Sequence, residues 1–300
     1  MITICIPVYN FNVNALVDEL IRQAHTLNVP VEIIAIDDCS FPSFRNLNTL
    51  LPGKTRFVQL ERNIGRAKIR NLFLQYATYD HLLFLDCDAL IIRHDFLIKY
   101  IDTIPDTTEY VVCGGRIYDP ARPPLKKMLR WKYGIERESR PVEVRQQDAN
   151  RSFMTNNFII HKLLLESVKF EERLTDYGHE DTLFGYALKK RKIAITHIDN
   201  PILNGDVEDN DVYLAKTERS IWNLLKIVAF TRNDTAFVKD VSLLRAANKL
   251  KKFGIKPLVR FLFRISKNTI RKKLSAGQVN LTVFDFYKLG LLFEHENNPS

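Results

Sequence analysis

The stretch Tyr79-Asp80-His81-Leu82-Leu83-Phe84-Leu85-Asp86-Cys87-Asp88-Ala89 decides the fold, because it ends an apolar run with two carboxylates. The apolar run 82–85 is short for a helix and suits a strand buried on both faces of a parallel sheet. Side chains alternate along a strand, so Asp86 and Asp88 are expected to leave the same face and share one cation. Ligands of open α/β sheets collect beyond the carboxyl ends of strands, where this pair falls. Taken alone, the triplet also fits two solvated turn carboxylates.

The chain before this stretch alternates strand-like and helix-like patterns. Strands are expected at 2–8, 31–36 and 55–60, and helices at 13–27 and 63–76. Repeated strand–helix units with short connections predict a mostly parallel, Rossmann-like α/β sheet with helices on both faces. Three strands then end in polar pairs at one edge of this sheet, namely Tyr9 and Asn10, Asp37 and Asp38, and Asp86 and Asp88.

Two arginines complete a candidate phosphate site. Arg66 and Arg70 are four residues apart and share one face of the predicted helix. An acidic pair that holds Mn²⁺ or Mg²⁺, with arginines nearby, is what binding a diphosphate requires. The chain has no G-x-x-x-x-G-K-[ST] and no G-x-G-x-x-G motif. We therefore expect a metal ion to make much of the phosphate contact.

Four motifs, in their order along the chain, resemble the glycosyltransferase family 2 enzymes, which have the GT-A fold. They are Cys5-Ile6-Pro7-Val8-Tyr9-Asn10, Ile36-Asp37-Asp38-Cys39-Ser40, Asn63-Ile64-Gly65-Arg66-Ala67-Lys68-Ile69-Arg70-Asn71 and Leu85-Asp86-Cys87-Asp88. The resemblance covers about residues 1–205. It implies a metal-dependent, inverting hexosyltransferase of the bacterial surface-polysaccharide type. Such an enzyme takes its sugar from a nucleotide-diphosphate sugar, with a UDP-sugar favoured.

The resemblance also assigns roles to individual residues. It implies that Pro7, Tyr9 and Asp38 touch the base, and that Arg66 or Arg70 lies near the diphosphate. Asp86 would serve the ribose and the metal, and Asp88 the metal.

The second half of the resembling region is expected to bind the acceptor. The segment 120–151 lacks clear periodicity and is interpreted as a functional loop or lid. Trp131 within it is a candidate acceptor contact, and the alternative is a Trp that packs the loop down. Glu180 and Asp181 open a helix, where acidic residues also simply favour the helix dipole. By resemblance Asp181 is the general base, with Glu180 as the alternative or an acceptor-binding neighbour.

The third metal ligand is a departure from the family pattern. Related sequences often place a His after this helix, in a stretch like Asn200-Pro201-Ile202-Leu203-Asn204, where this chain has Asn204. Asn204, a water molecule or His197 on the preceding strand could complete the shell. A lone His on a strand is more often a hydrogen-bonded structural residue.

Charge divides the chain into two regions. Residues 1–210 carry 27 Lys+Arg and 28 Asp+Glu, a net charge of −1, whereas residues 211–300 carry 17 and 7, a net charge of +10. We expect a GT-A domain at 1–210, with a nucleotide-sugar half (1–115) and an acceptor half (116–210), followed by a basic helical region at 211–300.

The basic segment Arg245–Lys273 holds eleven Lys+Arg and no acidic residue, interleaved with apolar residues. This pattern is typical of binding to an anionic membrane surface, and an ordinary helix with a solvated basic face is the alternative. No nucleic-acid motif accompanies the charge, so no nucleic-acid partner is expected. A saccharide or lipid-linked acceptor would suit such an enzyme.

The remaining sequence features bear on location and on other functions. The chain shows no basic leader, no apolar run of membrane-spanning length and no C-x-x-C spacing among its 4 cysteines. We expect a cytoplasmic protein, peripheral on the inner face of the cell membrane. Two alternatives remain open: a sugar nucleotidyltransferase, which should have a Gly-rich loop after its first strand, and a non-catalytic nucleotide-sugar-binding or scaffold protein of the same fold.

Overall fold

The computed structural model describes residues 1–296 of the 300-residue chain and divides it into two compact units. We call the first the sheet unit, which comprises residues 1–118, 139–175 and 187–206. The second, the helical unit, comprises residues 119–138, 176–186 and 207–296 of the described chain. This division differs from the expected boundary at residue 210, because two earlier segments group with the C-terminal helices.

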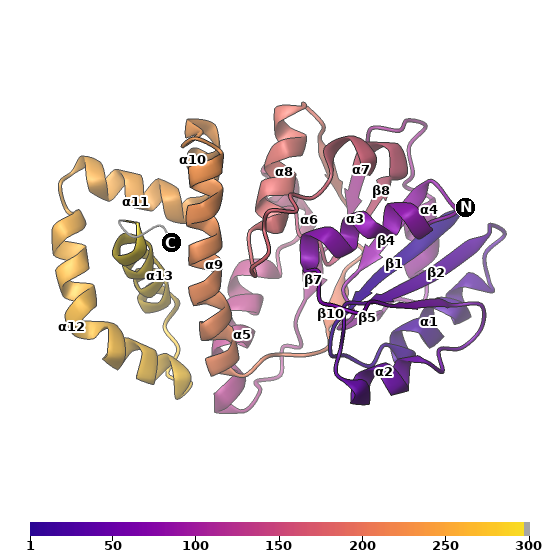
Figure 1. The fold of residues 1–300 in the computed structure, drawn as a ribbon, viewed down its shortest axis with the longest axis horizontal. Helices are drawn as coiled ribbons and strands as arrows, with labels where there is room; N and C mark the ends of the chain where they lie inside the picture. Colours follow the sequence, from indigo (N-terminus) through magenta and orange to yellow (C-terminus); the bar gives the residue numbers. More distant parts are fainter. Residues whose placement is uncertain (297–300) are drawn as a thin grey trace. The chain divides into compact units, whose positions relative to one another are not determined.

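A seven-stranded sheet organises the sheet unit (Figure 1), in the order β3-β2-β1-β4-β8-β6-β9. Its strands are β1 (Ile2–Val8), β2 (Val31–Asp37), β3 (Arg56–Gln59), β4 (His81–Leu85), β6 (Val111–Cys113), β8 (Asn157–His161) and β9 (Ile195–His197). Only β8 runs antiparallel to its neighbours, β4 and β6. The mostly parallel sheet predicted from the sequence is therefore confirmed.

Alternation along the central strand β4 explains why both faces of this sheet are covered. Leu83 and Leu85 are fully buried in the core cluster that includes helices α1 (Asn14–Ala24) and α4 (Phe96–Ile101). Phe84 points the other way, stacking on Phe158 with ring centroids 5.0 Å apart. Four further helices belong to this unit: α2 (Pro42–Asn48), α3 (Arg66–Tyr76), α6 (Val142–Gln147) and α7 (Lys162–Val168).

A second, three-stranded sheet was not predicted. It consists of β5 (Ala89–Leu90), β7 (Arg116–Ile117) and β10 (Ile202–Asn204), in the order β5-β10-β7. Strands of two or three residues leave no periodic signal in a sequence. Its consequence is functional, because it gathers the residues after β4, after β6 and after β9 at one place.

The segment 120–151, expected to be a loop or lid without regular structure, is instead largely helical. It contains a 3₁₀ turn (Leu125–Lys127), α5 (Met128–Tyr133), a π-helical turn (Gly134–Glu138) and α6. These pieces are five or six residues long at most, which is too short for an apolar repeat to stand out. The prediction of a loop is therefore wrong, and the role of the segment as a lid stays a prediction.

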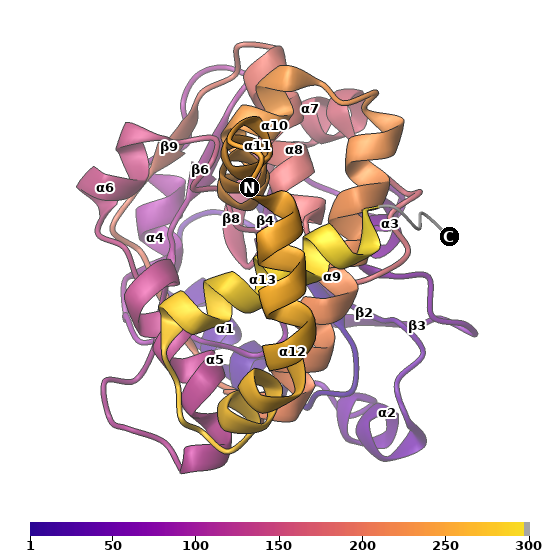
Figure 2. The same cartoon turned by 90° about the vertical axis from the view of Figure 1, so that its left-hand side faces the viewer.

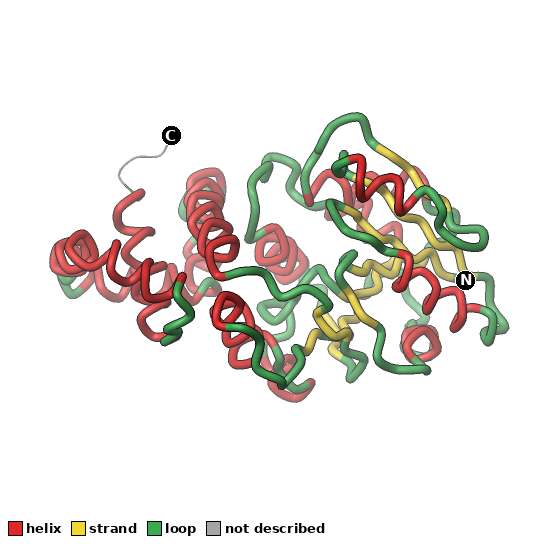
Figure 3. Tube along the Cα trace, turned by 90° about the horizontal axis from the view of Figure 1, so that it is seen from below, coloured by secondary structure: helices red, strands yellow, loops and turns green. Residues whose placement is uncertain are grey.

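The described part of the helical unit contains no strand (Figure 3). It holds the start of α8 (Glu180–Lys190), then α9 (Asn210–Phe230), α10 (Thr235–Asp240), α11 (Ser242–Lys252), α12 (Lys256–Ser275) and α13 (Leu281–His295). Helix α13 is buried along much of its length and packs on α9 and α12 (Figure 2). Among the described residues, no helix has the length and apolar character needed to cross a bilayer.

Candidate functional site

The two acidic residues after β4 lie in a turn that is clamped at both ends. The Asp86 amide donates to the Asn156 carbonyl at 3.0 Å, and the Gly205 amide donates to the Asp88 carbonyl at 2.8 Å. A Cβ on Gly205 would lie 2.6 Å from that carbonyl oxygen, so only glycine allows this approach. Neighbouring segments thus fix the backbone that carries both carboxylates.

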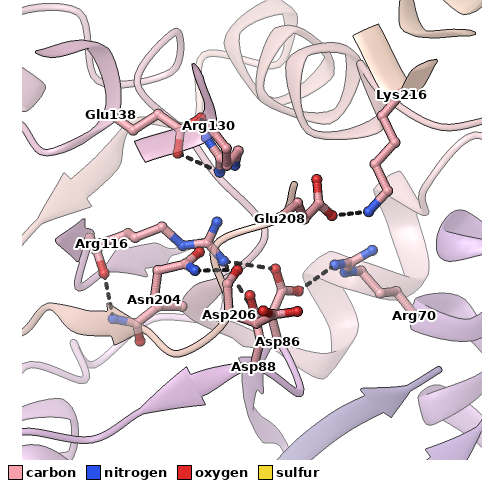
Figure 4. Close-up of polar contacts among 12 residues, drawn as sticks. Arg70, Asp86, Asp88, Arg116, Arg130, Glu138, Asn204, Asp206, Glu208 and Lys216 are labelled. Carbon is pink, nitrogen blue, oxygen red and sulfur yellow. Dashed lines mark hydrogen bonds and ion pairs between the residues drawn. The ribbon is translucent and has the colours of Figure 1, made fainter. Parts of the chain in front are cut away.

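Two arginines hold the Asp86 carboxylate, one on each oxygen (Figure 4). Arg70 Nη2 donates to Asp86 Oδ1 at 2.9 Å, and Arg116 Nη2 donates to Asp86 Oδ2 at 3.3 Å. The same Arg116 nitrogen lies 3.6 Å from Asp88 Oδ1. Both carboxylates therefore lie close to the same guanidinium group, that of Arg116.

The arginines differ in exposure, and this separates their roles. Arg70 is 2% exposed, and its second terminal nitrogen donates to the Arg66 carbonyl at 3.1 Å. A buried side chain with these partners positions Asp86 and is not presented to solvent. Arg66, the first residue of α3, is exposed and contributes electrostatically to both carboxylates. Of the two arginines that the sequence offered for a diphosphate, Arg66 is the accessible one.

The pKa values of the two carboxyls move in opposite directions. Burial would raise the pKa of Asp86, but Arg70, Arg116 and Arg66 together outweigh it and hold that pKa below its ordinary value. For Asp88, burial is the largest effect and the negative Asp86 adds to it, so its pKa is raised despite Arg116. Asp86 therefore stays ionised to lower pH than Asp88, and Asp88 gains most from an additional cation.

The oxygen atoms available as ligands near Asp88 decide how well a divalent metal ion fits. Asn204, on β10, pairs in register with Ala89, and its Nδ2 donates to the Asp206 carbonyl at 2.7 Å. Within residues 1–296, no group of three or more His, Cys, Asp or Glu side chains gathers to hold a metal. Mg²⁺ and Mn²⁺ nevertheless bind through one or two carboxylates when substrate phosphates and water complete the shell. Asp88, with Asp86 beside it, fits that kind of site.

His197 does not fit a metal site. It is buried on β9, where Nδ1 lies 2.8 Å from Arg145 Nη1 and Nε2 lies 2.9 Å from the Ala149 carbonyl. Both ring nitrogens are therefore engaged in hydrogen bonds. This geometry contradicts the ligand role that the sequence left open for His197.

The residues expected at the base lie at the ends of β1 and β2. Tyr9 exposes half of its surface, whereas Pro7 is half-buried. Asp38 is buried, and its carboxylate accepts from the amides of Ile64 at 2.6 Å and Gly65 at 3.0 Å. Burial raises the pKa of Asp38 even so. Its carboxylate thus holds the turn before α3, and Tyr9 offers the accessible ring.

The candidate base belongs to the helical unit. Glu180 and Asp181 form the first turn of α8, which follows a loop at 176–179. Asn223 Nδ2, from α9, donates to the carbonyls of Gly178 at 2.6 Å and Asp176 at 3.2 Å. Gly178 has φ 101°, and a Cβ there would lie 2.6 Å from Ser220 Cβ. Helix α9 therefore fixes the loop that presents the two acids.

Trp131 is half-buried on α5, and its indole N–H donates to the Asp119 carbonyl at 2.7 Å. This bond ties the segment together, as the packing alternative required. The ring's contact with an acceptor stays a prediction.

The model of the family described as "Glycosyl transferase family 2" matches residues 3–164, more than half of the chain. The chain belongs to glycosyl transferase family 2. It is thus a glycosyltransferase with the GT-A fold, as its motifs predicted. No curated protein matched this glycosyltransferase.

Solved structures share the fold of this glycosyltransferase. A mannosyltransferase from Pyrobaculum calidifontis in complex with GDP-Man and Mn²⁺ has a TM-score of 0.56 at 16% identity. The match covers 99% of this chain and 87% of the mannosyltransferase chain. Glucosyl-3-phosphoglycerate synthase from Mycobacterium tuberculosis, in complex with Mn²⁺, UDP and glucosyl-3-phosphoglycerate, has a TM-score of 0.51 at 16% identity. The match covers 75% of this chain and 79% of the synthase chain. Both are relatives in fold.

Two residues beside the acidic turn, Arg116 and Asn156, were not singled out from the sequence. Arg116 follows Gly114 and Gly115, where a Cβ on Gly114 would lie 2.3 Å from the Asn200 carbonyl and Gly115 has φ 93°. Two glycines between a strand and an arginine were the available signal. Asn156 is 4% exposed, and neither polar atom of its side chain has a hydrogen-bond partner among the described residues.

Proposed function

We propose that this glycosyltransferase transfers a sugar, with inversion, from a nucleotide-diphosphate sugar to a saccharide or lipid-linked acceptor in cell-surface polysaccharide synthesis. The observation that carries the proposal is the turn at the end of β4, where Arg116 contacts both Asp86 and Asp88. A cationic group beside two carboxylates can bind a diphosphate and a metal together.

The donor diphosphate is proposed to bind between Arg66, Arg116 and Asp88. Asp86, held by Arg70 and Arg116, keeps its charge and fixes the arginine that faces the phosphates. Mn²⁺ or Mg²⁺ would be held by Asp88 and Asp86, and Asn204 is a further candidate oxygen ligand. When bound, such an ion neutralises charge on the leaving diphosphate. Asp86 is also proposed to reach the ribose, with Tyr9 on the base, flanked by Pro7 and Asp38.

Asn156 is proposed to bind hydroxyl groups of the donor sugar. A buried amide that makes none of its hydrogen bonds is costly, at about 1–3 kcal/mol for each unsatisfied group. Its backbone already contacts the Asp86 amide, so it lies beside the acidic turn. A sugar supplies both donors and acceptors, which a side-chain amide can satisfy at once.

Asp181 is proposed as the general base that takes the proton from the acceptor hydroxyl, with Glu180 as an acceptor-binding neighbour. One base and one displacement invert the anomeric centre. Asn223 and Gly178 are positioning residues in this proposal, because they fix the loop before α8. Trp131 is proposed to stack on an acceptor sugar ring.

A location at the inner face of the cell membrane completes the proposal. A lipid-linked acceptor would be met there, and the basic segment Arg245–Lys273 is the part of the chain suited to an anionic surface.

Release of UDP or GDP from a panel of nucleotide sugars, with Mn²⁺ and without acceptor, tests the donor class. We expect slow turnover of one donor class, because water can replace an acceptor. Arg116→Gln should reduce this turnover about 100-fold, since removing one charge-stabilising donor typically costs that much. Arg93→Gln, which removes a surface arginine paired with Asp95, should stay within twofold. Equal turnover in both variants would contradict the role of Arg116.

A further inference from the structure

Helix α12 has two apolar faces, and only one is covered in the described structure. Val259, Phe263 and Leu274 are buried on the face that packs on α13 and α9. On the opposite side, Leu258, Phe261, Leu262 and Ile265 are 57%, 61%, 42% and 64% exposed. Their spacing of three and four residues aligns them along one line of the helix.

Phe253, at the end of α11, adds a fifth large exposed apolar side chain. We call Phe253, Leu258, Phe261, Leu262 and Ile265 the outer stripe. Single exposed apolar residues are ordinary, but a contiguous set rimmed by polar groups marks an interaction surface. The ordinary packed helix that the sequence left open would have a polar outer face, and the outer stripe argues against it.

The segment Arg245–Lys273, which carries the outer stripe, is basic, and most of its cations have no acidic partner among the described residues. Four cations of Arg245–Lys273 pair inward: Lys251 and Lys256 with Glu296, Lys267 with Glu294, and Arg271 with Glu218. The others have no acidic partner among residues 1–296, namely Arg245, Lys249, Lys252, Arg260, Arg264, Lys272 and Lys273. Arg260 and Arg264 are four residues apart, so they lie together on one side of the stripe.

We propose that α12 lies in the interface of an anionic lipid bilayer, with the outer stripe at the boundary between headgroups and acyl chains. The inference deepens the proposed function, on which it rests for the lipid-linked acceptor. The positive charge of α12 matches a negative membrane surface, and the Phe, Leu and Ile side chains of the outer stripe match the apolar layer below it. A helix of 20 residues is about 30 Å long and lies along the surface.

The charge pattern argues against two other occupants. If two copies of the chain paired through the stripe, the unpaired cations of each copy would face those of the other. A nucleic acid would satisfy the cations but leave the apolar stripe in water. A bilayer with anionic headgroups satisfies both.

The inner face makes α12 a firm support for this surface. Gly290 on α13 faces Phe263, and a Cβ on Gly290 would lie 2.2 Å from the Phe263 ring. The Phe263 ring also packs on Tyr287, with centroids 5.6 Å apart. Because these residues hold α12 from inside, changes to the exposed stripe are not expected to unfold the unit.

Co-sedimentation of the full chain with vesicles tests the proposal. The vesicles contain phosphatidylcholine alone or with about 30% phosphatidylglycerol. We expect binding to the anionic vesicles only, weakened by high salt. Phe261→Ser/Ile265→Ser should reduce partitioning at least tenfold by removing apolar burial, and Arg260→Gln/Arg264→Gln about tenfold by removing charge.

Matched controls come from the sheet unit. Leu50→Ser replaces a side chain that is 82% exposed, and Lys54→Gln/Lys68→Gln removes two exposed charges. Both should bind vesicles like the wild type. Equal binding to neutral vesicles, or equal loss in the controls, would overturn the proposal.

Two further readouts separate the possible failures. Light scattering measures whether the protein is a monomer or a dimer. If the wild type were a dimer and Phe261→Ser/Ile265→Ser a monomer, the outer stripe would mediate self-association, and the bilayer proposal would be overturned. Release of nucleotide from a donor, without vesicle binding, would refute the inference while leaving the proposed function intact. Vesicle binding without any donor turnover would support the inference and count against the proposed function.

Discussion

Replacing Asp181 by Asn is expected to lower kcat about 1,000-fold while leaving donor affinity unchanged. The asparagine amide keeps the size of the carboxylate. Its oxygen can still accept the hydrogen bond from the Thr182 backbone N–H, whose nitrogen lies 2.6 Å from Asp181 Oδ1. It cannot accept a proton, and general-base catalysis typically contributes 100- to 10,000-fold. Steady-state transfer kinetics, together with calorimetric donor binding, would separate these effects.

A carboxylate in the same loop supplies the control for Asp181. Asp176 pairs with Lys226 at 2.7 Å, and the side chains of Lys226 and Asp176 are 46% and 43% exposed. Such surface pairs contribute little, so Asp176→Asn should keep nearly full activity. If Asp181→Asn retained kcat and Glu180→Gln lost it, the base would be Glu180. Full activity in both would refute a base at this helix start.

Replacing Arg70 by Met is expected to reduce the free energy of unfolding by about 3 kcal/mol. Arg70 is buried against Asp86, and removing one partner of a buried pair leaves an uncompensated charge. Since Arg116 remains on Asp86, the loss should fall at the lower end of the usual 3–5 kcal/mol. Urea unfolding of Arg70→Met and of the exposed-pair control Arg22→Met, which faces Glu19, would measure the difference.

The same pair makes a pH prediction for that experiment. The pKa of Asp86 is depressed in the folded protein. The pair therefore stabilises the fold at pH values above the pKa of an unfolded Asp, which is near 4, and this stabilisation is lost as the pH falls through the lower pKa of the folded state. The gap between wild type and Arg70→Met should therefore shrink in acid. The double variant Arg70→Met/Asp86→Leu should recover much of the loss. A gap independent of pH, with no recovery, would contradict the account of this pair.

Local patterns predicted the N-terminal strands of the sheet well. The apolar runs of β1, β2 and β4 are each buried on both faces, so their sequence signal is continuous. The acidic turn after β4 could be located because polar residues interrupt that signal sharply. The geometry of that turn could not be predicted, because both carboxylates contact Arg116, which is distant in sequence.

The parts that escaped prediction depend on contacts distant in sequence. Arg116 reaches the acidic turn through β7, which joins β5 only by way of β10. Such short strands carry no period to recognise. The two faces of α12 posed a different difficulty, because both carry apolar residues. Only the packing of Val259 and Phe263 shows which face is covered.

Calorimetric titration of UDP and GDP, each with and without Mn²⁺, into wild type and Asp88→Ala tests the central claim most directly. The claim is that the turn after β4 binds the diphosphate of the donor with a divalent metal. We predict that one nucleotide binds wild type in a metal-dependent way, and that Asp88→Ala weakens this binding at least tenfold. Failure of both nucleotides to bind under any condition, or equal binding by Asp88→Ala, would contradict it.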